Sequence, residues 1–588
     1  GPSIDKSHLK YERLIMKEIF KLIKYMRGSA KYFILAMIFV ALETSLELAI
    51  PVFMADIIDY GIVTRDINYI YHQGIIMVLL AICSLVLGLL YSHFSSIAIN
   101  NFGSELRKIE FEKIQEYSFK NLDDFETSSI ITRLTGDVSV IQNAASNLRQ
   151  IVRGPVMLVM GLVYSFSISL EISLIFIISA PILAIGLFYI VYKVSPYYAK
   201  LQGKVDKLNV VVEENLNAIR IVKAYTMEDY EIDKFDKVDN DLKSHATKTF
   251  ALAALNAPLF QLVMYASIIM IMLYGGKLIF DGRLLVGELT GILSYVLQIM
   301  NSFMMLSNIF LMLTRSLASA ERINEIIEEE IDLKDGNLDI DVSTGDIKFE
   351  NVYFKYDSSA KEDVLKDINM HIKAGETIAI IGGTGSGKSS VVSLLPRLYD
   401  VSKGRILIDD INIKEYNLTK LRDSIAIVLQ KNVLFEGSIE DNLLWGNGMA
   451  SNEELDEALR HAGAYDFVYS FNDGLDTYLN EGGINLSGGQ KQRLCIARAL
   501  IKKPKILILD DSTSAVDSNT ERLIRDGLST YKDMTKIIIA QRISSIMHAD
   551  EIYILDDGRI VDHGSHQYLL ENNDIYKDLY DSQMRGDK

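Results

Sequence analysis

The residues of this chain that could do chemistry include a glycine-rich loop in its second half, "IAIIGGTGSGKSS". The loop directly follows an apolar run that is typical of a strand. Glycines let backbone N–H groups close around phosphate oxygens, and a helix after the loop presents its positive end to them. Lys388 would then neutralise the β- and γ-phosphates of ATP, and the Ser389 hydroxyl would bind Mg²⁺. The residues of this predicted ATP-binding loop are Gly382, Gly383, Thr384, Gly385, Ser386, Gly387, Lys388 and Ser389.

A second stretch, "ILILDDSTSAVD", ends an apolar run with two adjacent acids, Asp510 and Asp511. Such a run is typical of a buried strand that delivers a carboxylate to a metal ion. Asp510 is therefore predicted to be the second protein group that binds the Mg²⁺. The pattern alone leaves the role of Asp511 open.

The overall composition bounds the class of protein. The chain has 588 residues, too many for one ordinary core, and 49% of them are hydrophobic, which is high for a soluble protein. Its formal net charge of −17 disfavours nucleic acid as the main partner. The two cysteines, Cys83 and Cys495, lie far apart in very different surroundings, so they predict neither a disulfide framework nor a metal cluster.

The first half contains six apolar stretches, and each is long enough to cross a bilayer as a helix of about 20 residues. Lysines and arginines gather before the first stretch and in two long connections. Because cytoplasmic loops carry an excess of positive charge, both termini and these two connections are expected in the cytoplasm. We therefore predict a multi-pass protein of the cell membrane, in a bacterial inner or plasma membrane. The stretches are 31–55, 75–98, 150–170, 172–194, 255–280 and 287–313.

The two long connections have helical periodicity. Each could extend a membrane helix by about 35–45 Å at 1.5 Å per residue. Solvated helical hairpins would account for them, but we favour levers that touch another domain, because an ATP site must be connected mechanically to the membrane. The predicted order is an expression-tag remnant at 1–3, a cytoplasmic interfacial helix at 4–30, the six-helix transmembrane domain with both levers at 31–325, a polar linker at 326–345 and a nucleotide-binding domain at 346–588.

A third motif, "NLSGGQKQRLCIARAL", lies between the glycine-rich loop and the paired acids. Its residues Leu486, Ser487, Gly488, Gly489 and Gln490, directly before a helix, match the signature of ABC ATPases. With its six spans and the lever sequence "SSIITRLTGDVSVIQ", the chain resembles a half-size ABC exporter over essentially its whole length. The resemblance implies an α-helical six-span membrane domain followed by an α/β P-loop ATPase domain.

The resemblance also implies roles for single residues. Tyr356 would stack on adenine, a contact worth roughly 1–3 kcal/mol, although an ordinary strand aromatic would look the same. Gln430 would reach the Mg²⁺ and the attacking water. Ser514 and Asp517 would belong to the loop that crosses between two ATPase domains. In this family two such domains pair head to tail, and the signature of one completes the ATP site of the other, so a second half-transporter is the implied partner.

Two positions depart from the family pattern. Asp511 stands where the family has the glutamate that polarises the attacking water, and its shorter side chain withdraws the carboxylate by about 1.3–1.5 Å, comparable to the displacement of about 1 Å that costs ~10²-fold in rate. Gln541 stands where the family has histidine, and an amide cannot become a cation or relay a proton near neutral pH. The catalytic candidates Asp511, Gln541 and Gln430 are therefore expected to form a degenerate, slowly hydrolysing site. The intact signature would complete a competent site on a different partner subunit, and a homodimer with two slow sites is the alternative.

Candidate residues of a substrate pathway lie in the first and sixth spans. Glu43 and Glu47 are one helical turn apart, and intramembrane carboxylates could attract cationic amphiphiles or pair with polar groups of the bundle. Met300 and Met304 would adapt to varied apolar ligands, although such a stripe also occurs in helix packing. These residues favour multidrug export of lipophilic or amphiphilic small molecules, with lipid or peptide cargo as alternatives.

Three other functions share part of this pattern. A few relatives of the same architecture import siderophores. A soluble ABC ATPase of the DNA-repair type would share the nucleotide motifs, but the six apolar spans argue against it. A receptor or channel gated by ATP would tolerate weak hydrolysis.

Overall fold

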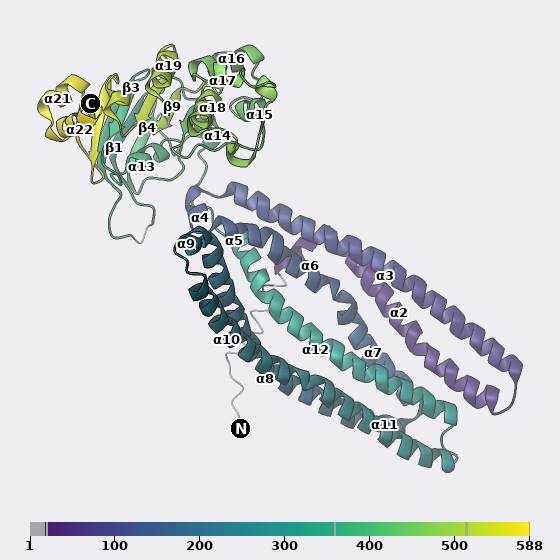
Figure 1. Ribbon diagram of the computed structural model, residues 1–588. Coiled ribbons are helices and arrows are strands. Elements are labelled where there is room, and N and C mark those ends of the chain that lie inside the picture. The colour runs from purple at the N-terminus through teal and green to yellow at the C-terminus, as the bar shows by residue number, and fades with distance from the viewer. Residues whose placement is uncertain (1–17, 19–20, 27, 358–359, 512–515, 587–588) are drawn as a thin grey trace. The chain divides into compact units, whose positions relative to one another are not determined.

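The computed structural model describes residues 18, 21–26, 28–357, 360–511 and 516–586, and the chain divides into two compact units (Figure 1). Unit 1 comprises Gly1–Gln115 and Glu126–Glu329, and unit 2 comprises Glu116–Phe125 and Glu330–Lys588. The predicted tag remnant and most of the predicted interfacial helix lie outside the described residues. Of that helix, the structure describes Glu18 and a stretch that includes the short turn η1 (Lys24–Met26).

Six helical segments of unit 1 are long and apolar enough to cross a membrane, which confirms the predicted multi-pass architecture. In chain order they are Ala30–Ile62, Ile67–Glu116, Thr127–Ile168, Leu170–Asn217, Glu228–Phe280 and Val286–Leu306. The helices that form them are α2 (Ala30–Asp56) with η2 (Ile57–Ile62), α3 (Ile67–Glu116), α5 (Thr127–Thr132) with η3 (Arg133–Asp137), α6 (Val138–Ser146) and α7 (Leu148–Ile168), α8 (Leu170–Asn217), α10 (Glu228–Ala254) with α11 (Asn256–Phe280), and α12 (Val286–Glu328).

Unit 1 is held together by α12, which packs on α7, α2 and α11, and by α8, which packs on α10 and α11. Tyr295 and Ile299 of α12 are fully buried in the resulting apolar core. Close packing of α12 against α2 requires Gly287, because a Cβ there would lie 2.2 Å from the carbonyl oxygen of Ala55. The Gly287 N–H donates to the Asp59 carboxylate at 2.6 Å, so Asp59 satisfies one of the N–H groups that the first turn of α12 leaves free.

The third and fourth spans form a very tight hairpin. Because α7 ends at Ile168 and α8 begins at Leu170, the connection between the two helices is Ser169 alone. The buried hydroxyl oxygens of Ser165 and Ser173, one on each helix, are 2.8 Å apart and hydrogen-bonded. The two helices are therefore joined by a single extended residue and by a side-chain hydrogen bond directly beside it.

The predicted levers are the long continuations of α3 and α8. The first turns at α4 (Phe119–Asp123), and the second turns at α9 (Ile219–Ala224). In the first lever, the buried Asp137 carboxylate accepts hydrogen bonds from Arg322 of α12 at 2.7 and 2.5 Å. A charge-assisted pair of this geometry fixes the lever to the end of α12.

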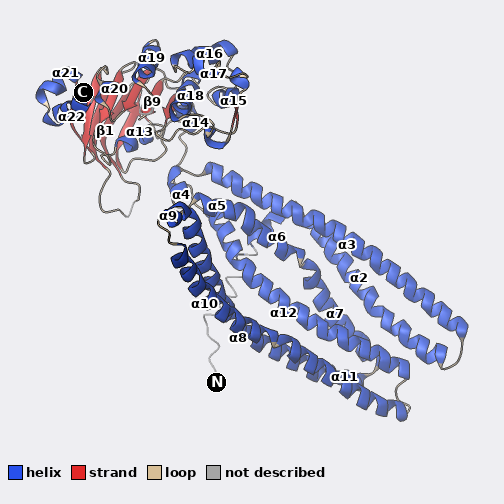
Figure 2. Ribbon diagram, in the orientation of Figure 1, coloured by secondary structure: helices blue, strands red, loops and turns tan. Residues whose placement is uncertain are grey.

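Unit 2 is an α/β domain with two main sheets (Figure 2). The six-stranded sheet has the order β12-β11-β3-β10-β9-β6 and is parallel except for β12. The four-stranded sheet has the order β2-β1-β4-β5 and is antiparallel. The strands are β1 (Ile347–Phe354), β2 (Leu365–Ile372), β3 (Thr377–Ile381), β4 (Lys403–Ile408), β5 (Ile411–Asn412), β6 (Ile425–Val428), β7 (Gly437–Ser438), β8 (Tyr478–Leu479), β9 (Ile506–Asp510), β10 (Thr535–Ile539), β11 (Glu551–Asp556) and β12 (Arg559–Gly564).

Helices alternate with the strands of unit 2 along the chain. After α4 they are α13 (Lys388–Leu394), α14 (Leu418–Asp423), α15 (Ile439–Leu444), α16 (Asn452–His461), α17 (Tyr465–Val468), α18 (Gly488–Ile501), α19 (Ser518–Ser529), α20 (Ile543–Ile546), α21 (His566–Asn572) and α22 (Asp574–Gly586). The structure has six apolar helices followed by an α/β domain, which confirms the predicted fold class.

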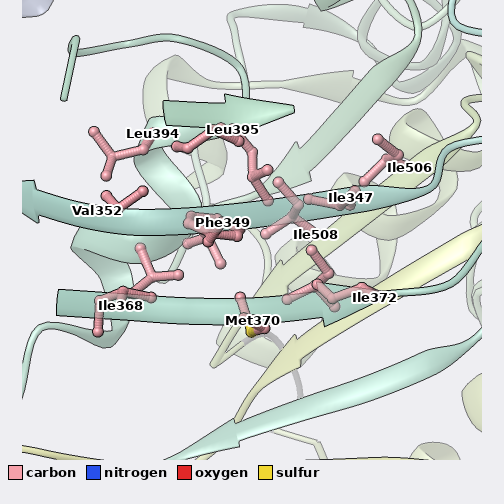
Figure 3. Packing of buried hydrophobic residues seen from close by; sticks show 14 of the residues in the cluster. Ile347, Phe349, Val352, Ile368, Met370, Ile372, Leu394, Leu395, Ile506 and Ile508 are labelled. Atoms are coloured by element: carbon pink, nitrogen blue, oxygen red, sulfur yellow. The ribbon is translucent and has the colours of Figure 1, made fainter. Parts of the chain in front are cut away.

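Strand β9 separates two apolar cores of unit 2. Ile506 and Ile508 face the core between the two sheets (Figure 3), and Leu507 and Leu509 face a second core that contains α18. Alternate residues of a strand point to opposite faces, so a strand buried on both sides must be apolar throughout. This explains the uninterrupted apolar run and places Asp510 at its carboxyl end.

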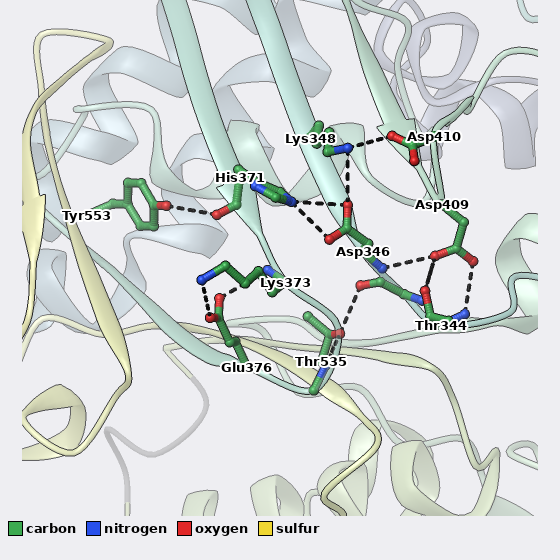
Figure 4. A network of polar contacts seen from close by, with 12 residues as sticks. Thr344, Asp346, Lys348, His371, Lys373, Glu376, Asp409, Asp410, Thr535 and Tyr553 are labelled. Atoms are coloured by element: carbon green, nitrogen blue, oxygen red, sulfur yellow. Dashed lines mark hydrogen bonds and ion pairs between the residues drawn. The ribbon is translucent and has the colours of Figure 1, made fainter.

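Asp409 fixes the segment that leads into β1 (Figure 4). Its carboxylate accepts hydrogen bonds from the N–H groups of Ser343, Thr344, Gly345 and Asp346 at 2.7 to 3.0 Å, and from two hydroxyls of the same segment. Burial raises the pKa of Asp409, but these hydrogen bonds outweigh burial and bring the pKa to about 2. The ionised carboxylate thus organises the segment directly before β1.

Candidate functional site

The predicted phosphate loop connects β3 to α13. Gly387 has φ of 97°, a left-handed conformation that favours glycine, and it caps the N-terminus of α13. Gly382 approaches β11 so closely that a Cβ would lie 2.0 Å from the carbonyl oxygen of Leu555. The residues from Gly382 to Ser389 therefore form one continuous turn into a helix, the arrangement that a phosphate cradle requires.

Lys388 lies over this loop. Its Nζ donates to the carbonyl oxygens of Gly382 and Gly383 at 2.9 and 2.7 Å. Burial lowers the pKa of Lys388, while the nearby carboxylates of Asp510 and Asp511 oppose that shift. The ammonium group is thus held between the loop and the acids, where it can neutralise phosphate charge.

Asp510 has the surroundings of a metal-binding carboxylate. It ends β9, is 5% exposed, and accepts a hydrogen bond from the Ser389 hydroxyl. Burial raises the pKa of Asp510, and that hydrogen bond opposes the rise. A hydroxyl in direct contact with a buried carboxylate is a donor pair that suits Mg²⁺, which usually takes one or two protein ligands with phosphate and water. Ser389 and Asp510 would therefore hold the ion beside the phosphate loop.

The structure brings together Asp511, Gln430 and Gln541. Gln430 Nε2 donates to Asp511 Oδ2 at 3.4 Å, and Gln541 Nε2 donates to the same oxygen at 3.3 Å. Asp511 has φ of 47°, and its N–H donates to the Ile539 carbonyl of the neighbouring strand at 2.8 Å. Burial raises the pKa of Asp511, and the hydrogen bond from Gln430 opposes the rise. All three catalytic candidates thus meet at one carboxylate oxygen.

Sequence reasoning missed the residue that positions the Gln541 loop. Gln583 of α22 donates from Nε2 to the Gln541 carbonyl at 2.8 Å and accepts from the Ile543 N–H at 2.8 Å. One amide thereby satisfies a backbone acceptor and a backbone donor on either side of Arg542. No local motif marks Gln583, which is 42 residues away in the sequence.

Tyr356, the predicted adenine-stacking residue, follows the end of β1. The residue is 43% exposed, and its hydroxyl is hydrogen-bonded to the Ser390 hydroxyl of α13 at 2.8 Å. The ring also contacts Phe354 and Tyr399, with centroids 4.8 and 5.1 Å away in edge-to-face geometry. Tyr356 therefore presents an accessible aromatic surface that is tied to the helix of the phosphate loop.

The signature residues are organised by the start of α18. Ser487 caps this helix, accepting from the Gln490 N–H at 3.3 Å, and its own N–H donates to the Gln490 side chain at 2.9 Å. This reciprocal capping box gives the signature a defined helix N-terminus. Leu494 and Cys495 of α18 pack in the second core of unit 2, whereas α13 packs in the first. The signature and the phosphate loop thus belong to different parts of the domain.

Of the two residues expected in the crossing loop, Ser514 lies outside the described residues. Asp517 caps α19, where its carboxylate accepts from the Thr520 N–H at 3.2 Å and from the Thr520 hydroxyl at 2.6 Å. These hydrogen bonds lower the pKa of Asp517. Asp517 therefore fixes the start of a helix directly after that loop.

In unit 1, Glu43 and Glu47 are paired with arginines of α7. Arg149 donates to Glu43 at 2.5 Å, Arg153 donates to Glu47 at 2.6 Å, and Arg153 also lies 3.8 Å from Glu43. The sequence left two roles open for these carboxylates, attraction of cationic amphiphiles and pairing with polar groups of the bundle. In the structure they are paired within the bundle. The four formal charges cancel, which weakens the attraction for cationic amphiphiles. Sequence reasoning included pairing within the bundle but did not name the arginine partners, although Arg153 lies inside the predicted third span.

The two methionines of the predicted pathway differ in exposure. Met300 is fully buried in the core of unit 1, and Met304 is partly buried against the same core. In this conformation Met300 contributes to helix packing.

Comparison with known families matches one model to the helical first half of the chain and another to the α/β second half. Residues 33–303 match the family of the ABC transporter transmembrane region, and residues 365–514 match the ABC transporter family.

Relatives match nearly the whole chain. The uncharacterized ABC transporter ATP-binding protein YfiB of Bacillus subtilis (strain 168) is 36% identical, covering 94% of this chain and 96% of its own. The ATP-dependent lipid A-core flippase of Photorhabdus laumondii is 30% identical, covering 90% of this chain and 91% of its own. Among solved structures, a bacterial Atm1-family ABC exporter with ATP bound is similar with a TM-score of 0.81 at 25% identity, over 94% of this chain and 99% of that one.

Proposed function

This chain belongs to the ABC transporter family as a half-size exporter, with one membrane domain and one ATPase domain, and we propose that it supplies the slowly hydrolysing site of a heterodimeric pump. As a half-transporter it requires a second ABC half. The proposal concerns which of the two ATP sites this chain builds, and what the pump moves.

The observation that supports the slow site is the pair of amides on Asp511. A general base must reach the attacking water, and the aspartate carboxylate begins one methylene too far back. Its Oδ2 is approached by two amide N–H groups at 3.3 and 3.4 Å, from Gln541 and Gln430. Neither amide can accept and pass on a proton near neutral pH. The site keeps the groups that would hold ATP and Mg²⁺, but it has Asp511 and Gln541 in place of the glutamate and histidine that support fast cleavage in this family.

The intact signature points to a competent site on the partner. Ser487 and Gln490 form a complete capping box at the start of α18. This helix N-terminus can therefore contact the phosphates of an ATP that is bound to another subunit. We propose that the partner carries a glutamate and a histidine at the positions of Asp511 and Gln541. A homodimer with two slow sites is the alternative.

The cargo proposed for the pump is an amphiphilic compound with an apolar body. Two observations support this class: the similarity to a lipid A-core flippase, and a membrane bundle whose carboxylates are neutralised by arginines. The neutral cluster argues against selection for cations alone, so multidrug or lipid export is favoured over export restricted to lipophilic cations.

ATP turnover by the purified full chain, alone and with its partner, tests the slow site. We expect slow turnover alone and at least a tenfold gain in the complex. The double change Asp511→Glu with Gln541→His should raise the turnover of the chain alone by about 10-fold or more, since general-base contributions are typically about 10²–10⁴. Brisk turnover by the unaltered chain, or no gain from the double change, would contradict the proposal.

Direction is tested separately in inside-out vesicles that contain both subunits. ATP-dependent accumulation of a fluorescent amphiphile inside the vesicles indicates export, and ATP-dependent release of preloaded dye indicates import.

A further inference from the structure

The segment that contains α4 belongs to the ATPase unit, although the helices on both sides of it belong to the membrane unit. Ser118 donates from its hydroxyl to Asp332 at 2.5 Å, and Asn121 donates from its amide to the Glu330 carbonyl at 3.0 Å. Because α3 and α5 continue the chain on either side, any displacement of α4 is passed covalently to the first lever.

Tyr399 connects this segment to the nucleotide site. Its hydroxyl donates to the Asp123 carboxylate at 2.7 Å, and its ring packs against Phe119 with centroids 6.0 Å apart. The same ring meets Tyr356 with centroids 5.1 Å apart, edge to face with an interplanar angle of 88°. One side chain therefore contacts both α4 and the residue proposed to stack on adenine.

The connection continues to the phosphate loop. The Tyr356 hydroxyl is bonded to Ser390, which lies two residues after Lys388 on α13. One cavity, of about 440 Å³, lies in unit 1. A separate cavity of about 360 Å³ lies in unit 2 and is lined by Ser118, Tyr356 and Tyr399 among others. This second cavity therefore borders both tyrosine side chains and Ser118, the residue that caps α4.

The hydroxyl of Tyr399 is a reliable donor. Burial and the hydrogen bond to Asp123 both raise its pKa, so it stays protonated at physiological pH. A hydrogen bond to a carboxylate is stronger than one between neutral groups.

We propose that Tyr399 is a positioning residue that conveys occupancy of the nucleotide site to α4, through its ring contact with Tyr356 and its hydroxyl contact with Asp123. A base that stacks on Tyr356 would restrict that ring and thereby the edge-to-face contact with Tyr399. The inference rests on the proposed stacking of adenine on Tyr356.

The test compares Tyr399→Phe with a matched variant, Tyr469→Phe, in the full chain in lipid nanodiscs. Tyr469 also donates its hydroxyl to an aspartate, Asp456, at 2.6 Å in the same unit. For each protein we would measure the melting temperature, the affinity for MgATP, and the change in hydrogen–deuterium exchange of residues 116–125 when MgATP is added.

In the unaltered chain, MgATP should slow exchange in residues 116–125. Tyr399→Phe should keep the ATP affinity within about threefold and lose at least half of that change, whereas Tyr469→Phe should lose none of it. An exchange response that persists in Tyr399→Phe would overturn the inference, as would its absence in an unaltered chain that binds ATP. If the unaltered chain binds no ATP, the proposed function fails first and the inference fails with it.

A double-mutant cycle distinguishes a direct connection from general loosening. If the Tyr399 hydroxyl acts through Asp123, the combination of Tyr399→Phe with Asp123→Ala should reduce the exchange response no further than either change alone. Additive losses would show that the two residues act independently and would overturn the proposed route.

Discussion

The two adjacent aspartates of β9 show how one peptide bond separates two chemical environments. Asp510 is the last residue of a buried strand, and its carboxylate is enclosed beside Ser389. Asp511 has left the strand with φ of 47°, and its carboxylate meets the amides of Gln430 and Gln541. The first environment suits a metal ion, and the second suits the reacting end of a phosphate.

At the scale of single residues, the raised pKa of Asp510 predicts that the effect of Mg²⁺ on ATP affinity depends on pH. Only the carboxylate form binds Mg²⁺ well, and a raised pKa means that protonation begins at a higher pH than for an ordinary aspartate. The gain in ATP affinity given by Mg²⁺ should therefore shrink as the pH is lowered from 7.5 to 5. Calorimetric titration of ATP with and without Mg²⁺ measures this gain.

Asp510→Asn is the control for that titration. Its Mg²⁺-dependent gain should be small at both pH values, because the titrating group is gone. An equal loss on acidification in both proteins would assign the effect to the nucleotide phosphates and contradict the role of Asp510.

At the scale of elements, the C-terminal helix α22 contributes to the site through Gln583. Changing Gln583→Ala removes the acceptor of the Ile543 N–H and the donor to the Gln541 carbonyl. Backbone exchange at residues 541–543 should then rise about 5-fold or more, since a lost hydrogen bond costs about 1 kcal/mol. Gln567→Ala is the matched change, because the Gln567 amide donates to the exposed Glu571 on its own helix. Equal exchange in both variants would contradict a positioning role.

A second element-scale prediction concerns the turn before β1. Asp409→Asn removes the charge that accepts six hydrogen bonds from residues 343–346, and should lower unfolding stability by about 1–3 kcal/mol. Its neighbour Asp410 makes an exposed ion pair with Lys348 at 2.5 Å, so Asp410→Asn should cost under about 1 kcal/mol. Thermal unfolding of the two full-length variants measures the difference, and equal losses would be unexpected.

The contrast between local and distant contacts explains what sequence could predict. The six spans follow from runs of apolar residues, and the phosphate loop follows from glycines at fixed spacing beside a strand, so both are local patterns. The pairing of Glu43 with Arg149, the contact of Gln583 with Gln541, and the contact of Tyr399 with Asp123 join residues 106, 42 and 276 positions apart. Such contacts depend on which helix faces come together, and one sequence does not specify that.

At the scale of the whole molecule, the proposed slow site would make the pump asymmetric. With MgATP and vanadate, which mimics the transition state of hydrolysis, nucleotide should be trapped at about one site per complex. A photoreactive ATP analogue trapped in this way should label the partner's phosphate loop far more than residues 382–389 of this chain. Equal labelling of the two subunits would contradict the asymmetry.

The one-residue joint at Ser169 has a practical consequence for mapping this protein in cells. An epitope or reporter placed between the third and fourth spans has no flexible loop to occupy and would have to unwind α7 or α8. The turn at residues 63–66, between η2 and α3, offers several exposed positions. Antibody access from outside intact cells is therefore better probed there. If an antibody failed to bind an epitope inserted at Ser169, that result would not show on which side of the membrane the epitope lies.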